Sequence, residues 1–172
     1  MEVRHGSSLK AQQRTILVVD DDENDRLLMA RALKSVDTQC SIHLLSGGNE
    51  AIAYLSGAGR FADRDEFQFP GYILTDLKMR DGNGFDVLQY LKRHPDKCVF
   101  PVIILSGSGD THDVAQAYQL GASAYFIKPS NIDELRTLLR KIYECFSECE
   151  VPQVSSSGKR LPTEPRGKLR PE

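Results

Sequence analysis

The sequence predicts an α/β fold, a doubly wound arrangement in which helices cover both faces of one parallel five-stranded sheet. Short apolar runs alternate with longer segments of helical character between residues 15 and 148, and strand-helix units in series are typical of a parallel sheet. The chain has 172 residues, of which 40% are hydrophobic and 27% charged. This length and composition favour one domain, over residues 15–148, with one sizeable core.

The first two units precede a polar segment. Thr15–Asp20 is an apolar run rich in β-branched residues, and Arg26–Val36 contains helix formers without Gly or Pro, so they predict a strand and a helix. Cys40–Leu45 predicts a weaker second strand, and Gly47–Leu55 predicts the helix that follows it. Gly57–Gln68 is polar and contains turn residues, so we expect a long loop or an extension of the preceding helix.

The last three units show clearer periodicity. Pro70–Asp76 predicts the third strand, and Phe85, Leu88 and Leu91 recur behind it at helical spacing. Apolar residues at i, i+3, i+4 and i+7 make the final helix the clearest of all. The fourth and fifth units are two strands, each followed by its helix: Phe100–Ser106 with residues 110–120, and Ala122–Lys128 with Asn131–Phe146.

The composition argues against several classes of protein. A formal net charge of −2 and a pI near 6.1 give no reason to expect nucleic-acid binding, which needs a concentrated basic surface. No apolar run approaches the roughly 20 residues of a membrane span, and residues 1–14 lack the apolar core of a signal peptide. We therefore expect a cytoplasmic protein with a flexible extension over residues 1–14. A Pro-rich, charged and disordered tail over residues 149–172 is too short for a DNA-binding domain.

Polar residues with reactive side chains follow four of the five predicted strands. Asp20 and Asp21 end the first strand, Asp76 the third, Ser106 the fourth and Lys128 the fifth. The carboxyl ends of parallel strands lie along one edge of a sheet, and ligands of open α/β sheets bind at that edge. We therefore expect these five side chains to lie close together, an arrangement that chance explains poorly.

The residue types at this edge are those of a metal-dependent phosphoryl transfer. Asp20, Asp21 and Asp76, with no built-in cation expected beside them, repel one another by an amount on the order of kilocalories. A divalent cation relieves that repulsion, and Mg²⁺ fits best because it needs few protein ligands and keeps phosphoryl oxygens in its shell. Asp76 is then placed as the nucleophile, while Lys128 and Ser106 bind phosphoryl oxygens.

Each motif also has a simpler structural interpretation. An Asp-Asp-Asp-Glu run before a helix is often an N-cap with first-turn acids that interact favourably with the helix dipole. A Lys-Pro pair often marks only the start of a helix. Ser106–Gly109 contains the small residues of a phosphate-binding loop but lacks the Gly-Lys-Ser/Thr of a P-loop, so we interpret it as a turn.

Taken together, the motifs resemble the receiver domains of two-component response regulators over about Thr15 to Phe146. The matching motifs are ILVVDDDENDR, ILTDLKMRDGNGFDVL, PVIILSG and GASAYFIKPS. The resemblance implies a (βα)₅ flavodoxin-like fold with strand order 2-1-3-4-5, and transfer of a phosphoryl group to Asp76 from a histidine kinase or a histidine phosphotransfer protein. The chain looks most similar to the single-domain, chemotaxis-regulator-like branch. Gly57–Gln68 and the SGSGD turn resemble members that serve phytochrome-type histidine kinases.

The same resemblance assigns metal ligands. Asp21, Asp76 and the backbone carbonyl of Lys78 are implied to bind Mg²⁺ directly, and Asp20 is implied to act mostly through water. The side chain of Lys78 is expected to point over the acyl phosphate. The resemblance implies a phosphoacceptor switch that assists its own phosphorylation and dephosphorylation, and not an enzyme.

Switch residues follow from the resemblance as well. Ser106 matches the switch Ser/Thr, Tyr125 the aromatic switch and Lys128 the phosphoryl-binding lysine, and the Lys128–Pro129 peptide bond is expected to be cis. No effector domain is expected after Phe146. Output is therefore expected through the face of the fourth helix, fifth strand and fifth helix, toward a protein target or a second copy in a homodimer.

The chain also departs from the family pattern. Arg80 stands where the family often has Pro, and Gly82-Asn83 where it often has Met-Asp, so the loop after Asp76 is expected to move differently. Two other functions stay open. One is a phosphohydrolase with an Asp nucleophile, although Lys78 replaces the second Asp of its usual Asp-x-Asp pattern; the other is a receiver that only binds partners without being phosphorylated.

Overall fold

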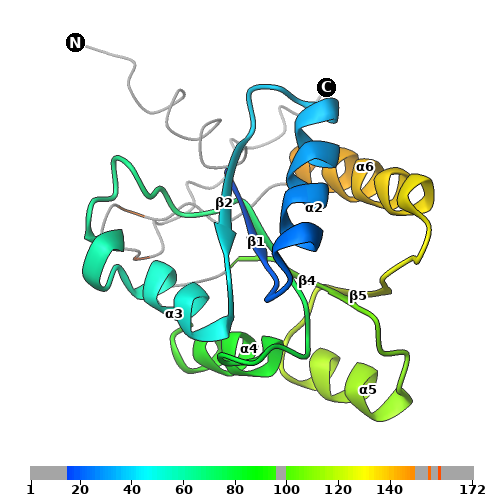
Figure 1. The fold of residues 1–172 in the computed structure, drawn as a ribbon. Coiled ribbons are helices and arrows are strands. Elements are labelled where there is room, and N and C mark those ends of the chain that lie inside the picture. Colours follow the sequence, from blue (N-terminus) through cyan, green and yellow to red (C-terminus); the bar gives the residue numbers. More distant parts are fainter. Residues whose placement is uncertain (1–14, 96–99, 150–154, 156–158, 160–172) are drawn as a thin grey trace, which may run out of the picture.

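The computed structural model describes residues 15–95, 100–149, 155 and 159 of the chain (Figure 1). The predicted extension over residues 1–14 and most of the predicted tail lie outside the described residues. Within the described ranges, no helix has both the length and the apolar character needed to cross a membrane.

Five parallel strands form one sheet in the order β2-β1-β3-β4-β5, which confirms the predicted fold. The strands are β1 (Thr15–Val19), β2 (Ser41–Leu45), β3 (Tyr72–Thr75), β4 (Val102–Ser106) and β5 (Ala124–Ile127). Because β1 lies between β2 and β3, the strand order reverses there, and open α/β sheets bind ligands at such a reversal.

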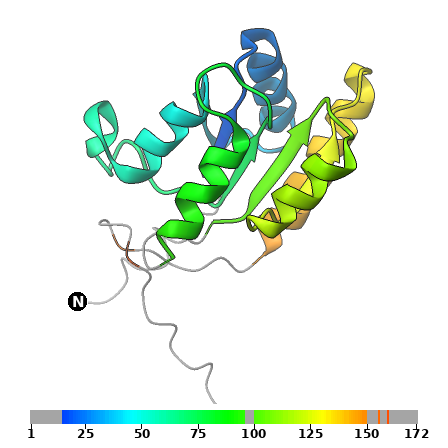
Figure 2. The same ribbon diagram turned by 90° about the horizontal axis from the view of Figure 1, so that it is seen from below.

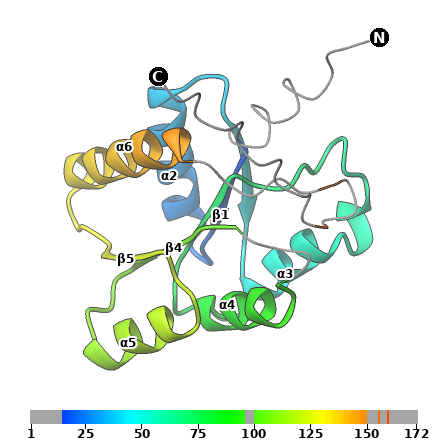
Figure 3. The same cartoon turned by 180° about the vertical axis from the view of Figure 1, so that it is seen from behind.

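Helices cover both faces of this sheet (Figures 1 and 3). α2 (Glu23–Val36) and α6 (Ile132–Glu148) lie together on one face. Figure 2 shows α4, in green, and α5, in yellow-green, nearest the viewer and on the other face of the sheet from α2. The elements of this second face are α3 (Gly48–Ser56), the short 3₁₀ helix η1 (Gly59–Ala62), α4 (Gly84–Arg93) and α5 (Thr111–Gln119).

The core is divided by the sheet into two apolar layers. Along β1, Ile16 and Val18 pack in the layer beneath α2 and α6, whereas Leu17 and Val19 pack in the layer beneath α3, α4 and α5. All four side chains are fully buried. Burial on both faces explains why the strands read as continuous apolar runs in the sequence, and each such side chain contributes roughly 1.5–3 kcal/mol.

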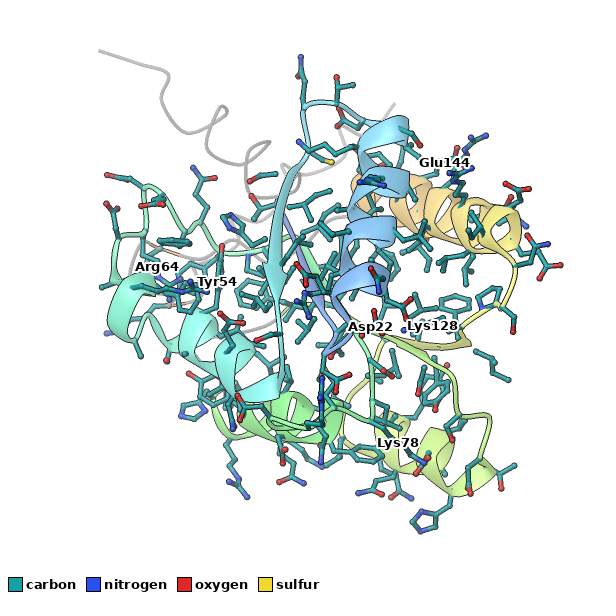
Figure 4. The ribbon with its side chains drawn as sticks, in the orientation of Figure 1. Asp22, Tyr54, Arg64, Lys78, Lys128 and Glu144 are labelled. Atoms are coloured by element: carbon teal, nitrogen blue, oxygen red, sulfur yellow. The ribbon has the colours of Figure 1, made fainter. Side chains whose placement is uncertain are left out.

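The polar segment after α3 folds back onto the domain. Gly57 ends α3 with a positive φ of 73°, and Phe61 in η1 is buried. Arg64 donates to the backbone carbonyls of Leu55 and Phe67, both at 3.1 Å. It also lies against the ring of Tyr54, as Figure 4 shows. The expected loop is therefore an ordered segment held by Arg64, with one short turn of helix inside it.

One predicted backbone feature is wrong. No peptide bond within the described ranges is cis, so Lys128–Pro129 is trans. The trans isomer of an X-Pro bond is favoured by about 0.5–1 kcal/mol. In this conformation the amide of Lys128 donates to the carbonyl of Ser106 at 2.7 Å, which continues the β4–β5 pairing past the end of β5.

Candidate functional site

Three carboxylates meet at the carboxyl edge of β1 and β3. Val19 lies opposite Thr75 in the register of these strands, and the amide of Asp76 donates to the carbonyl of Val19 at 2.8 Å. Asp20, Asp21 and Asp76 each offer one carboxylate oxygen, and the three oxygens lie within 4.8 Å of one another. The structure thus brings together the carboxylates that the sequence placed at this edge; we call them the acidic cluster.

Lys128 lies on the inner side of the acidic cluster. Its Nζ is 2.6 Å from Oδ2 of Asp20 and 2.8 Å from Oδ2 of Asp25. The side chain of Lys128 is 15% exposed and that of Asp20 only 2%, and Figure 4 shows Lys128 near the first turn of α2. The sequence did not single out Asp25, because an acid in the first turn of a helix is already explained by the helix dipole.

Burial and pairing set the charges on this inner side. Burial raises the pKa of Asp20 above its ordinary value, although the hydrogen bonds from Lys128 and from the Asp22 amide partly offset this. Burial also acts to lower the pKa of Lys128, but its hydrogen bonds to Asp20 and Asp25 outweigh burial, so the pKa is raised. Lys128 therefore keeps its proton, and its positive charge is a permanent part of the site.

Arg80 lies on the outer side of the acidic cluster. Its Nε donates to Oδ2 of Asp21 at 3.0 Å, and its backbone N–H donates to the same oxygen at 3.3 Å. Burial acts to raise the pKa of Asp21, but the hydrogen bonds and charge of Arg80 outweigh burial, so the pKa is lowered. The expectation that the cluster has no built-in cation is therefore wrong, because Lys128 and Arg80 each pair with one carboxylate.

The Asp-Asp-Asp-Glu run contains both a helix N-cap and two members of the acidic cluster. Asp22 is the N-cap of α2, and its carboxylate accepts from the amides of Asn24 and Asp25 at 2.8 and 3.1 Å. Asp20 accepts from the Asp22 amide at 2.9 Å. The structural role thus falls on Asp22, which leaves the two preceding acids for the cluster.

The loop after β3 carries Asp76 and Lys78. Asp76 is half-buried, and its Oδ1 accepts from the amide of Leu77 at 2.6 Å. The ammonium group of Lys78 lies 2.9 Å from Oδ2 of Asp113 in α5, which agrees with its position in Figure 4. This ion pair raises the pKa of Lys78 and lowers that of Asp113. The sequence did not predict this contact with α5.

The predicted switch residues lie next to that ion pair. Ser106 is buried at the end of β4, and its hydroxyl accepts from the amide of Ser108 at 3.3 Å. Tyr125 is half-buried and its hydroxyl donates to the carbonyl of Ser108 at 2.7 Å. The hydroxyl of Ser108 donates to Asp113 at 3.0 Å. Hydrogen bonds and one ion pair therefore link Lys78 to Tyr125 through α5 and the β4–α5 loop.

Comparison with known proteins places this site in a family. Residues 16–140 match the response regulator receiver domain. The transcriptional regulator NtrC of Salmonella typhimurium is 32% identical over 143 residues, which cover 83% of this chain but 27% of NtrC. The chain thus spans about a quarter of NtrC. The response regulator Rcp1 of Synechocystis sp. is 30% identical over 129 residues, which cover 75% of this chain and 86% of Rcp1.

Solved structures show the same fold. The phosphorylated cyanobacterial phytochrome response regulator RcpA superposes with a TM-score of 0.72 at 29% identity, covering 78% of this chain and 94% of RcpA. The Mn²⁺-bound form of Rcp1 superposes with a TM-score of 0.67 at 26% identity, covering 80% of this chain and 96% of Rcp1. With its match over residues 16–140 and its strand order, the chain belongs to the response regulator receiver family.

Proposed function

We propose that the chain is a stand-alone response regulator that accepts a phosphoryl group on Asp76 in a Mg²⁺-dependent reaction. The observation that carries this proposal is the meeting of three carboxylate oxygens within 4.8 Å at the strand-order reversal, with Lys128 beside them. Rcp1 supports the stand-alone character, since the match covers 86% of its length. The proposed donor is a histidine kinase or a histidine phosphotransfer protein.

The donor set fits a hard divalent cation. Asp21, Asp76 and the carbonyl of Lys78 would hold Mg²⁺ directly, with Asp20 acting through water, and such oxygen ligands suit Mg²⁺. The similar response regulator Rcp1 has been solved in a form that binds Mn²⁺. When bound, the metal supplies positive charge to the phosphoryl oxygens during transfer.

The side chains then have distinct tasks. A carboxylate oxygen of Asp76 attacks phosphorus, the bond between phosphorus and the donor histidine nitrogen breaks, and an acyl phosphate forms on Asp76. Lys128 turns its ammonium group from Asp25 toward a phosphoryl oxygen. The hydroxyl of Ser106 donates to a second phosphoryl oxygen. The chain acts as a switch that takes part in its own modification.

Output would leave through the surface of α5, β5 and α6. Movement of Ser106 toward the phosphoryl group would break its contact with Ser108 and so disturb the hydrogen bonds that hold Tyr125. The effect is a shift between conformations that differ in affinity for a partner, which is a protein target or a second copy of the chain. Because RcpA is a phytochrome response regulator, a phytochrome-type kinase is the first donor to try.

A phosphorylation assay tests the proposal. The chain and its Asp76→Asn variant are incubated with acetyl phosphate, with Mg²⁺ or with chelator, and analysed by intact mass spectrometry. The proposal expects one phosphoryl group on the parent with Mg²⁺, and none with chelator or on Asp76→Asn. Rapid turnover of many phosphate esters would indicate a phosphohydrolase instead. No modification under any condition would indicate a module that only binds partners.

A further inference from the structure

Arg80 binds one carboxylate of the acidic cluster through two of its groups. Both its Nε and its backbone N–H donate to Oδ2 of Asp21. The guanidinium-bearing side chain is 87% exposed, whereas the side chain of Asp21 is 23% exposed. The contact therefore joins a solvated cation to a partly buried anion that the proposed function assigns to the metal.

The backbone beneath Arg80 is held in place by α3. The carbonyls of Asp81 and Gly82 accept from the amides of Asn49 and Gly48 at 3.2 and 2.9 Å, and the Asn49 side chain donates to the Asp81 carboxylate at 2.8 Å. Gly82 has a φ of 71°, and a Cβ there would lie 2.7 Å from the amide nitrogen of Asn49. This anchored turn keeps Arg80 beside the acidic cluster, while most of its side chain is exposed to solvent.

The three carboxylates are not equally available to a cation. Asp20 is paired with Lys128, whose side chain is only 15% exposed. Asp76 accepts from the Leu77 amide. Asp21 is paired with Arg80, so a metal that takes an oxygen of Asp21 must compete with this exposed guanidinium. A hollow of about 470 Å³ beside Asp21, lined in part by Arg80, gives the side chain room to withdraw.

We propose that Arg80 is a built-in competitor of Mg²⁺ for Asp21, and that it sets the metal concentration at which the site fills. The inference rests on the proposed function, since it requires the acidic cluster to bind Mg²⁺. In the metal-free protein Arg80 lowers the repulsion among the carboxylates. When the metal binds, the guanidinium leaves Asp21 and the metal gains that oxygen at the expense of an exposed ion pair, which is worth little.

The test is a Mg²⁺ titration of Arg80→Gln without any phosphoryl donor. The urea midpoint of the full chain is measured against metal concentration, because a ligand that binds only the native state raises stability by mass action. We expect Arg80→Gln to bind Mg²⁺ about two- to fivefold more tightly than the parent. Its stability in chelator should be equal to or slightly below that of the parent.

Two further variants sharpen the result. Arg93→Gln removes the same charge from the last turn of α4, on an exposed side chain, and should leave the Mg²⁺ affinity unchanged. Arg80→Lys keeps the charge but loses the Nε donor, and should give an intermediate affinity. Equal affinities for the parent and Arg80→Gln, or a weaker one for Arg80→Gln, would overturn the inference. A parent that Mg²⁺ does not stabilise at all would overturn the metal site itself, and the inference with it.

Discussion

The two sides of the acidic cluster differ in how firmly their cations are held. On the inner side, Lys128 is 15% exposed and contacts two carboxylates, whereas on the outer side Arg80 is 87% exposed and contacts one. Removing one partner of a buried ion pair is costly because the other partner is left as an unpaired buried charge. An exposed pair is worth only about 0–1 kcal/mol. The inner charge is therefore structural, and the outer charge is easily displaced.

Removing the inner cation should have the largest effect. Lys128→Met leaves Asp20 buried without its partner, and we expect the free energy of unfolding in chelator to fall by about 3–5 kcal/mol near neutral pH. Urea unfolding measures this loss. Lys141→Met, an exposed position on α6, should stay within about 0.5 kcal/mol of the parent. Similar stabilities for the two variants would mean that Lys128 is not the structural cation of the site.

The contact of Lys78 with Asp113 should influence the lifetime of the acyl phosphate. We expect the ammonium group of Lys78, once released from Asp113, to shield the acyl phosphate from water. Lys78→Ala should therefore speed dephosphorylation, whereas Asp113→Asn should release Lys78 and slow dephosphorylation. We expect changes below about tenfold, because the ion pair is exposed. Loss of the phosphoryl group after removal of the donor gives the rate. Rates that move in the same direction in both variants would contradict the proposed role of Asp113.

Asp76→Asn should have a smaller effect on stability. The substitution removes one negative charge from the acidic cluster, so the free energy of unfolding in chelator should rise, but by less than about 1 kcal/mol because Lys128 and Arg80 already offset the repulsion. The stabilisation by Mg²⁺ should shrink, since a proposed ligand is lost. Urea unfolding with chelator and with Mg²⁺ measures both the gain in stability without metal and the smaller stabilisation by metal. A variant less stable than the parent in chelator would argue against repulsion among the carboxylates.

The smallest predicted effect is a difference between the pKa values of the neighbouring residues Asp20 and Asp21. In the metal-free protein, Asp20 should titrate above the ordinary pKa of 3.8 and Asp21 below it. Asp21 therefore adds stability above 3.8 that is lost as pH falls through its lowered pKa. The raised pKa of Asp20 destabilises the folded state. This penalty is absent below pH 3.8 and develops as pH rises through the raised pKa. Carboxyl NMR resonances followed against pH report both values, and Arg80→Gln should raise only that of Asp21.

Much of this site was readable in the sequence, but its pairing was not. The meeting of Asp20, Asp21 and Asp76 follows from apolar runs that end in acids, because parallel strands share one carboxyl edge. The strand order followed only from the resemblance to receiver domains. The partners Asp25 and Asp113 were missed, since first-turn acids have an ordinary helical explanation. Arg80 was noticed only as a departure from the family pattern. Side-chain pairs between distant segments depend on the packed structure, which no local pattern encodes.

The anchored turn also couples two distant segments of the chain in folding. Gly47, the N-cap of α3, has no side chain to accept from the first amides of the helix, and the carbonyls of Gly82 and Asp81 accept from the amides of Gly48 and Asn49, respectively, instead. The first turn of α3 can therefore be completed only when the loop after β3 is in place. These two amides should open to hydrogen exchange together with that loop, as one cooperative unit. They thus offer a probe of the loop that carries Asp76, and this probe needs no substitution near that loop.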